Sequence, residues 1–110
     1  MRRNEIKDEE YLDWLRTQPC CICGFVCKGT KPTGKPYHNA VHHVNGRWND
    51  YETVPLCDFT TSTPGNNNCH HDKIHKKMKY YRPILTEKAT EYREIYVRQS
   101  MDNNKGTTGS

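Results

Sequence analysis

Residues 40–57 read AVHHVNGRWNDYETVPLC and predict two short strands joined by a hairpin-like connection. Residues 40–45 and 51–56 have the short, β-branched character of strands, and the connection runs from Gly46 to residue 50. Neighbouring side chains on a strand point to opposite faces, so the adjacent His42 and His43 face different ways. One imidazole can therefore bind a metal ion while the other acts from a different direction.

The second informative stretch is residues 69–75, CHHDKIH, which opens a predicted helix over residues 69–79. An i, i+4 spacing places His71 and His75 on one helix face, where two imidazoles can chelate one ion. The alternative is a solvated basic face, because several lysines lie nearby: Lys73, Lys76, Lys77 and Lys79.

Cysteine spacing predicts a structural zinc site. Cys20 and Cys23 form a Cys-x2-Cys pair, and Cys57 and Cys69 supply a second pair that completes a tetrahedral Zn²⁺ site. The second pair is widely spaced, and the polar segment 58–68 explains this as a loop inserted between two ligands.

Two further cysteines are surplus to four-coordination. Cys21 and Cys27 are interpreted as small packing residues, with Cys27 as the substitute ligand.

Composition supports the need for a metal. The chain has 110 residues, of which 33% are hydrophobic. A small polar domain cannot bury a large core, and such domains usually depend on metals, disulfides or a partner. Six Cys and six His favour metal. No apolar run is long enough to cross a membrane and no secretory signal is visible, so we expect a cytoplasmic location where cysteines bind metal rather than form disulfides.

The remaining segments predict one domain over residues 1–101. A helix is expected over 8–18, a strand pair with a tight turn at Gly24 over 20–27, and a last helix over 86–101 capped by Thr86. Exposed, dispensable loops are expected over 28–36 and 58–68, and a disordered tail over 102–110.

Charge points to a polyanionic partner. The net charge is +4, and residues 57–85 hold five Lys and Arg against two Asp. An excess of positive charge in the Cys/His-rich part is the distribution expected if that part faces a polyanion such as a nucleic acid. A merely solvated surface is the alternative for a charge of this size.

Together these segments resemble the HNH endonuclease family, whose core is a ββα-metal motif. The resemblance rests on PCCICG at 19–24, AVHHV at 40–44, DYETVPLC at 50–57 and CHHDKIH at 69–75, and it covers about half of the chain. The strings are similar to those of phage-type HNH nucleases, including the recombination-enhancement group. The resemblance implies a small α+β fold, with a ββα-metal core and zinc knuckle flanked by N- and C-terminal helices.

The resemblance also implies two metal sites. His42, His71 and His75 would hold a catalytic divalent ion, which can be Mg²⁺, Mn²⁺, Ni²⁺ or Zn²⁺. In the most similar pattern, His70 is the fourth ligand of the structural zinc. The higher affinity of a thiolate for zinc favours Cys69 in that place, so both alternatives stay open.

The implied activity is hydrolysis of DNA phosphodiester bonds. His43 would be the general base, oriented either by Asp50, from its place in DYETVPLC, or by Asn49, from its residue type. The phosphate backbone would be gripped by basic residues of the helix and beyond: Lys73, Lys76, Lys77, Lys79 and Arg82.

Two other functions compete with the nuclease. A non-catalytic zinc ribbon that binds nucleic acid needs only the zinc ligands and the basic patch, but leaves His42, His43, His71 and His75 without a role. A zinc-stabilised protein-interaction domain would need more cysteines and an apolar docking surface. Nothing in the sequence indicates an oligomeric state or a preferred DNA sequence.

Overall fold

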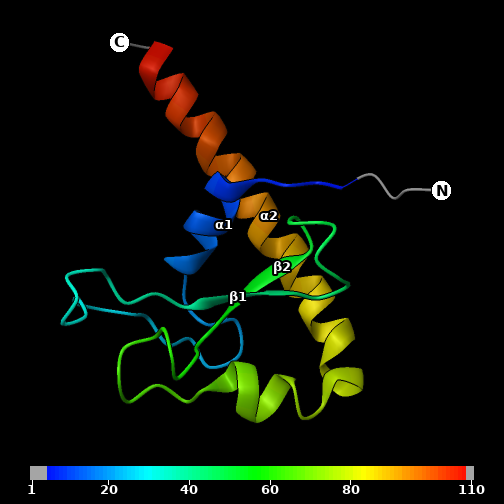
Figure 1. The fold of residues 1–110 in the computed structure, drawn as a ribbon. Helices are drawn as coiled ribbons and strands as arrows, with labels where there is room; N and C mark the ends of the chain where they lie inside the picture. Colours follow the sequence, from blue (N-terminus) through cyan, green and yellow to red (C-terminus); the bar gives the residue numbers. More distant parts are fainter. Residues whose placement is uncertain (1–4, 109–110) are drawn as a thin grey trace.

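The computed structural model describes residues 5–108. In chain order its elements are α1 (Glu9–Arg16), β1 (Ala40–His43), β2 (Thr53–Leu56), the short π-helix η1 (His70–Ile74) and α2 (Met78–Thr108). Figure 1 shows the small sheet at the centre, with η1 at one end and α2 running past the sheet toward the C-terminus. The fold is therefore α+β, with a two-stranded sheet and helices around it.

The two strands form the predicted antiparallel hairpin, although each is shorter than expected. His42 lies opposite Val54, and His43 lies opposite Thr53. Because side chains alternate along a strand, His42 shares its face with Val54, and His43 lies on the other face. Proline at position 55 is tolerated because both strands are edges of a two-stranded sheet.

A different hydrophobic cluster packs on each side of the hairpin. On one side Val54 and Leu56 pack with Ile74, Leu85 and Ala89, which brings η1 and α2 onto the sheet. The other side carries an aromatic cluster that joins α1 to the middle of α2. Its members are Tyr11, Leu12, Leu15, Trp14, Val41, Tyr51, Tyr92 and Tyr96.

Helix α1 begins at Glu9, one residue after the predicted start, and Asp8 is its N-cap. The Asp8 side chain accepts a hydrogen bond from the Tyr11 backbone N–H at 3.1 Å, which satisfies a free donor of the first turn. Glu9 and Glu10 follow in that turn, where the helix dipole favours negative charge. The helix ends at Arg16, before the predicted end at residue 18.

Residues 20–27, all within the described part of the chain, form a tight turn instead of the predicted strand pair. The Gly24 N–H donates to the Cys20 carbonyl at 2.8 Å, and the Cys20 N–H donates to the Phe25 carbonyl at 2.9 Å. Gly24 has φ of +77°, a conformation that glycine adopts without strain. The Cys21 N–H donates to the Pro55 carbonyl of β2 at 3.0 Å, which ties the turn to the sheet.

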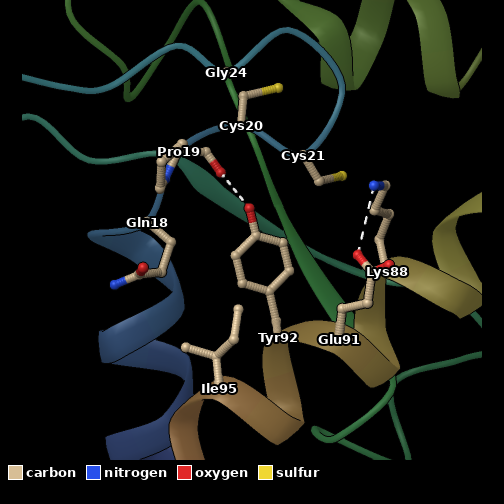
Figure 2. A pocket seen from close by; sticks show the side chains of 9 residues that line it. All are labelled: Gln18, Pro19, Cys20, Cys21, Gly24, Lys88, Glu91, Tyr92 and Ile95. Atoms are coloured by element: carbon tan, nitrogen blue, oxygen red, sulfur yellow. Dashed lines mark hydrogen bonds and ion pairs between the residues drawn. The ribbon is translucent and has the colours of Figure 1, made fainter. Parts of the chain in front are cut away.

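The turn at 20–24 also contacts α2. Figure 2 shows the Tyr92 hydroxyl, which donates to the Pro19 carbonyl at 2.9 Å, beside the Lys88–Glu91 ion pair at 3.5 Å. These residues line a cavity of about 450 Å³ between the turn and the helix. The long C-terminal helix therefore braces the segment that carries the first two zinc-type cysteines.

The helices after the hairpin differ from the prediction. The predicted helix over 69–79 is replaced by the five-residue η1, and α2 begins at Met78 rather than at Thr86. Thr86 lies inside α2, where its hydroxyl donates to the Arg82 carbonyl at 2.8 Å, so it is not a cap. Pro83 removes one helical hydrogen bond, and the packing of Leu85 and Ala89 against the core favours the helix across it.

The two predicted loops behave differently. Residues 28–36 are exposed apart from the half-buried Lys31, as expected, and a bridge between Thr30 and Pro36 closes them into a small hairpin. Segment 58–68 is not the exposed loop that its composition predicts, because Asp58 is 4% exposed and Ser62 is 3% exposed. The Asp58 backbone and the Ser62 side chain form hydrogen bonds inside the molecule, whereas Phe59, Thr60 and residues 64, 65 and 67 are exposed as predicted.

The C-terminal helix extends further than predicted. It continues to Thr108, over part of the segment 102–110 that the sequence predicts as a disordered tail, and residues 109–110 lie outside the described range. Within residues 5–108 no helix is both long enough and apolar enough to cross a membrane.

Candidate functional site

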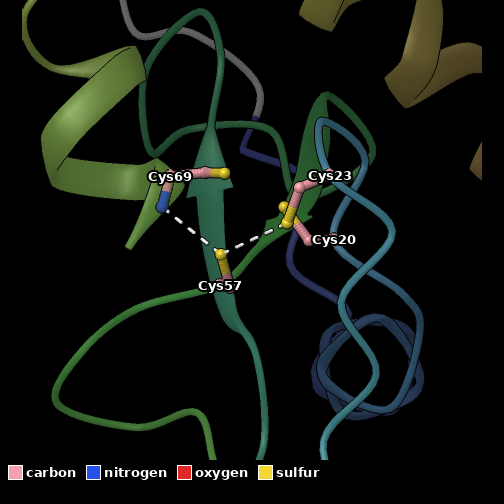
Figure 3. A group of neighbouring side chains, drawn as sticks. All are labelled: Cys20, Cys23, Cys57 and Cys69. Atoms are coloured by element: carbon pink, nitrogen blue, oxygen red, sulfur yellow. Dashed lines mark hydrogen bonds between the residues drawn. The ribbon is translucent and has the colours of Figure 1, made fainter. Parts of the chain in front are cut away.

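Four cysteines come together at the junction of the 20–24 turn, β2 and η1, and we call them the cysteine cluster: Cys20, Cys23, Cys57 and Cys69. Figure 3 shows their sulfur atoms pointing toward one another, and all four lie within 4.8 Å of each other. The Cys23 and Cys57 sulfurs are 3.7 Å apart, and all four thiols are free. Zn–S bonds of about 2.3 Å in a tetrahedron separate sulfurs by roughly 3.8 Å, so this arrangement fits a structural metal ion such as zinc.

The chemistry of the surroundings also suits a bound metal. Cys20, Cys57 and Cys69 are buried, and burial raises the pKa of the Cys57 thiol to about 11. A metal ion deprotonates a coordinating thiol outright, and so offsets the cost of placing thiolates in this interior. The backbone contributes as well, because the Cys69 N–H donates to the Cys57 sulfur at 3.3 Å.

The surplus cysteines lie outside the cluster. Cys27 donates to the Asn39 side-chain oxygen at 3.2 Å, and Cys21 packs against the core, where burial raises its pKa to about 12. Their placement agrees with the prediction that both are packing residues. Between the two open alternatives for the fourth ligand, the structure places the Cys69 sulfur, and not the His70 ring, with the other three cysteines.

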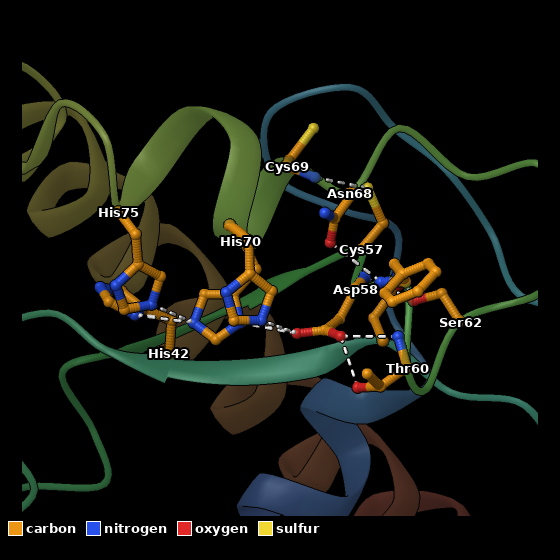
Figure 4. Close-up of polar contacts among 12 residues, drawn as sticks. His42, Cys57, Asp58, Thr60, Ser62, Asn68, Cys69, His70 and His75 are labelled. Atoms are coloured by element: carbon orange, nitrogen blue, oxygen red, sulfur yellow. Dashed lines mark hydrogen bonds and ion pairs between the residues drawn. The ribbon is translucent and has the colours of Figure 1, made fainter.

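Three imidazoles form a second group, the histidine cluster, which consists of His42 from β1, His70 from η1 and His75 just after η1. The His70 Nε2 atom lies 3.2 Å from His42 Nδ1 and 3.1 Å from His75 Nε2 (Figure 4). Burial, followed by the neighbouring His70 and His75, lowers the pKa of His42 to about 4. The His42 ring is therefore neutral at neutral pH and can present a lone pair to a metal ion, and burial lowers the pKa of His70 as well.

The other ring nitrogen of His42 makes no polar contact within the described part of the chain. His42 Nε2 is buried and has no hydrogen-bond partner among the described residues. His42 belongs to the same buried strand face as Val54, so its ring is held in place by the core. Its position is set by the sheet, while His70 and His75 are set by η1.

The histidine cluster differs from the set that the resemblance implies, because His70 takes the place of His71. In η1 the His75 N–H donates to the His70 carbonyl, five residues earlier, at 3.1 Å. This wider π-helical turn brings residues i and i+5 to one side, whereas the i, i+4 spacing assumed for His71 and His75 applies to an α-helix. The His71 Nε2 atom instead lies 3.0 Å from Asp58 Oδ2.

His43 stands on the other face of the hairpin and is paired with Asp50. Its Nε2 atom lies 2.9 Å from Asp50 Oδ1, and Asp50 is 2% exposed. Although burial acts in the opposite direction, hydrogen bonds from the Asp8 backbone N–H and from His43 hold the pKa of Asp50 below its usual value. The charged Asp50 carboxylate accepts a hydrogen bond from the His43 Nε2–H group. This arrangement leaves the His43 Nδ1 lone pair available as a base.

The structure separates the two candidate orienting residues. Asp50 contacts His43, whereas Asn49 donates to Glu52 at 3.1 Å and accepts from the Tyr51 N–H at 2.9 Å. The position that the DYETVPLC string indicates is therefore the one that touches His43.

A cavity of about 480 Å³ joins the two sets of histidines. It is lined by the histidine cluster and His43 on one side, and by residues of α1 and of the β1–β2 connection on the other. The second side brings Arg16 and Arg47 to the cavity, which the sequence analysis did not single out; Arg16 is far from the histidines in the chain, and Arg47 lies in the connection after β1. The lysines predicted to grip a backbone, together with Arg82, are all exposed: Lys73, Lys76, Lys77 and Lys79.

Comparison with known proteins gives one similarity. The chain is 32% identical over 82 residues to the uncharacterized protein YdfU from Escherichia coli (strain K12). The aligned part is 72% of this chain and 20% of YdfU, so the chain spans about a fifth of the length of that relative. No protein-family profile and no solved structure matches the chain.

Proposed function

We propose that this protein is a metal-dependent DNA endonuclease built on a ββα-metal core of the HNH type. The observation that carries the proposal is the convergence of three imidazole nitrogens beside a separate His–Asp pair on the wall of one cavity. The hairpin and η1 supply these groups in the order that the resemblance implies. A divalent ion would be held by His42, His70 and His75.

The proposed reaction divides labour between the two sets of histidines. His43 accepts the proton of the attacking water at Nδ1, while Asp50 holds Nε2 and stabilises the imidazolium that forms. The water oxygen attacks phosphorus, the bond to the leaving oxygen breaks, and that oxygen takes a proton from solvent. A divalent ion, when bound, stabilises the negative charge that develops on the phosphate.

DNA would be bound through its phosphates. Arg16 and Arg47 flank the cavity, and Arg16 is 29% exposed and paired with Asp13 and Glu9 of its own helix. The exposed basic residues of η1 and the start of α2 add positive charge along the chain from residue 73 to residue 82. Contacts of this kind carry little sequence information and weaken as salt rises.

The test is cleavage of supercoiled plasmid by the purified protein in Mg²⁺, Mn²⁺, Ni²⁺ or Zn²⁺, beside the H43A variant. Wild type should nick or linearise the plasmid with at least one ion, and the variant should not. If wild type cleaves with none of these ions yet binds the plasmid, the non-catalytic zinc-ribbon alternative accounts for the cysteine cluster and the basic residues, and the nuclease proposal fails.

A further inference from the structure

The two metal-type clusters are joined through neighbouring residues. The Cys57 sulfur accepts from the Cys69 N–H at 3.3 Å, and the Cys57 carbonyl accepts from the His70 N–H at 3.1 Å. One residue further along each segment, the His70 Nδ1 atom lies 3.0 Å from Asp58 Oδ2. Asp58 therefore directly follows Cys57, and His70 directly follows Cys69, as Figure 4 shows.

Asp58 is held in a single orientation. Its Oδ1 atom accepts from the Thr60 N–H at 2.8 Å and from the Thr60 hydroxyl at 2.6 Å. Its own N–H donates to the Ser62 hydroxyl at 2.9 Å, and the side chain is buried. With Oδ1 occupied, the Oδ2 atom is directed at the two neighbouring histidines of η1.

We propose that Asp58 is the positioning residue of the histidine cluster, and that the rest of segment 58–68 holds the Asp58 side chain in place. Asp58 accepts a hydrogen bond from the His70 Nδ1–H group. This bond fixes the tautomer in which the Nε2 lone pair of His70 faces His42 and His75. The same oxygen lies 3.0 Å from His71 Nε2, so this nitrogen is directed at the carboxylate and not at the other imidazole nitrogens, although the His71 ring lies against His70 and His75. One carboxylate thus decides which of two consecutive histidines serves as a ligand.

This inference deepens the proposed function, because it concerns the metal of the same cavity, but it is tested by metal binding alone. Partners of this kind typically change metal affinity by roughly 10–100-fold. Their effect passes through the ligand rather than through the fold. The discriminating measurement is therefore affinity at the histidine cluster while the cysteine cluster stays loaded with zinc.

The experiment titrates zinc-loaded protein with Co²⁺ and follows its visible absorption, with zinc content measured in parallel. D58N should bind Co²⁺ about 10–100-fold more weakly than wild type, with one zinc retained and a cooperative thermal unfolding transition. D72N is the matched control, because Asp72 carries the same charge on the exposed side of η1. It should bind Co²⁺ as wild type does.

A second variant covers the case in which D58N does not fold. T60V removes one of the two hydrogen bonds to Asp58 Oδ1 from an exposed residue, and should weaken Co²⁺ binding in the same direction by a smaller factor. Wild-type affinity in both D58N and T60V, or an equal loss in D58N and D72N, overturns the inference.

Loss of a Co²⁺ equivalent in H71A also overturns it, since Asp58 and His71 would then be ligands themselves. The outcome is separable from that of the proposed function. Co²⁺ binding that depends on Asp58, in a protein that cuts no plasmid, supports this inference while the nuclease proposal fails.

Discussion

The cysteine cluster and the histidine cluster lie next to each other in the fold, yet they differ in ligand chemistry and in exposure. The cysteine cluster presents four sulfurs, three of them from buried residues, and so has the closed form of a structural zinc site. The histidine cluster presents three nitrogens, with His75 exposed and a cavity alongside. Three ligands and an open side are the form in which a metal can also meet a substrate.

The comparison teaches how a small, polar chain can combine stability and reactivity. Soft sulfur ligands close one ion inside the core, where it replaces apolar area that the chain lacks. In the proposed function, imidazoles would hold another ion nearer the surface, between the buried His42 and the exposed His75. Loss of a ligand from the cysteine cluster should therefore unfold the protein. Loss of a ligand from the histidine cluster should leave the fold intact.

The largest effect is expected from removal of a cysteine ligand. C57S should abolish zinc binding and the cooperative unfolding transition, because the apparent binding energy of a structural zinc, about 10–16 kcal/mol, exceeds the stability of most small domains. Circular dichroism and metal analysis measure both. C27S is the matched control and should keep zinc and fold, since Cys27 lies outside the cluster. A folded, zinc-free C57S protein would contradict the structural role.

Loss of a histidine ligand should be local. H75A should lose the metal of the histidine cluster and plasmid cleavage together, while zinc content and thermal midpoint stay close to wild type, because His75 is exposed. K76A, at the next exposed position, is the control for a surface truncation. Plasmid assays beside metal analysis decide the matter, and unchanged cleavage in H75A would remove His75 from the ligand set.

Removal of the proposed general base should leave both metal sites intact. H43A should reduce the cleavage rate about 10²-fold or more, the usual contribution of a positioned general base, with both metals still bound. Asp50 acts through His43, so D50N should lower the rate by a smaller factor. N49A should leave the rate unchanged, because Asn49 contacts Glu52 and Tyr51 and not His43. Equal losses in N49A and D50N would show that local folding, and not the His–Asp pair, is being measured.

Much of this comparison could be predicted from residue spacing. The Cys-x2-Cys pair and Cys57 after β2 indicate three of the four members of the cysteine cluster, because each lies at a turn or strand end whose geometry is local, while the fourth stays open between Cys69 and His70. The opposite orientation of His42 and His43 followed from the strand period alone.

The histidine cluster could not be predicted fully, because its ligand set depends on one turn of π-helix. An α-helical period favours His71 with His75, while the observed period favours His70 with His75. The role of Asp58 was hidden for a similar reason. Segment 58–68 has the composition of an exposed loop, and only the tertiary hydrogen bonds of Asp58 and Ser62 show that it is built into the interior.

The smallest expected effects contrast the two inserted segments. The Ser62 hydroxyl is buried, accepts from the Asp58 N–H at 2.9 Å and donates to the Asn39 side chain at 2.8 Å. S62A removes both hydrogen bonds, so the free energy of unfolding should fall by roughly 1–3 kcal/mol.

Replacement of residues 31–35 by a two-residue link should change that free energy by less than about 0.5 kcal/mol, because the segment is largely exposed and closed by its own bridge. Urea unfolding of zinc-loaded protein measures both changes. If the shortened 28–36 loop costs as much as S62A, the two insertions are equally structural. That result would contradict the view that segment 58–68 supports the fold by holding Asp58, whereas segment 28–36 is an exposed loop with little effect on stability.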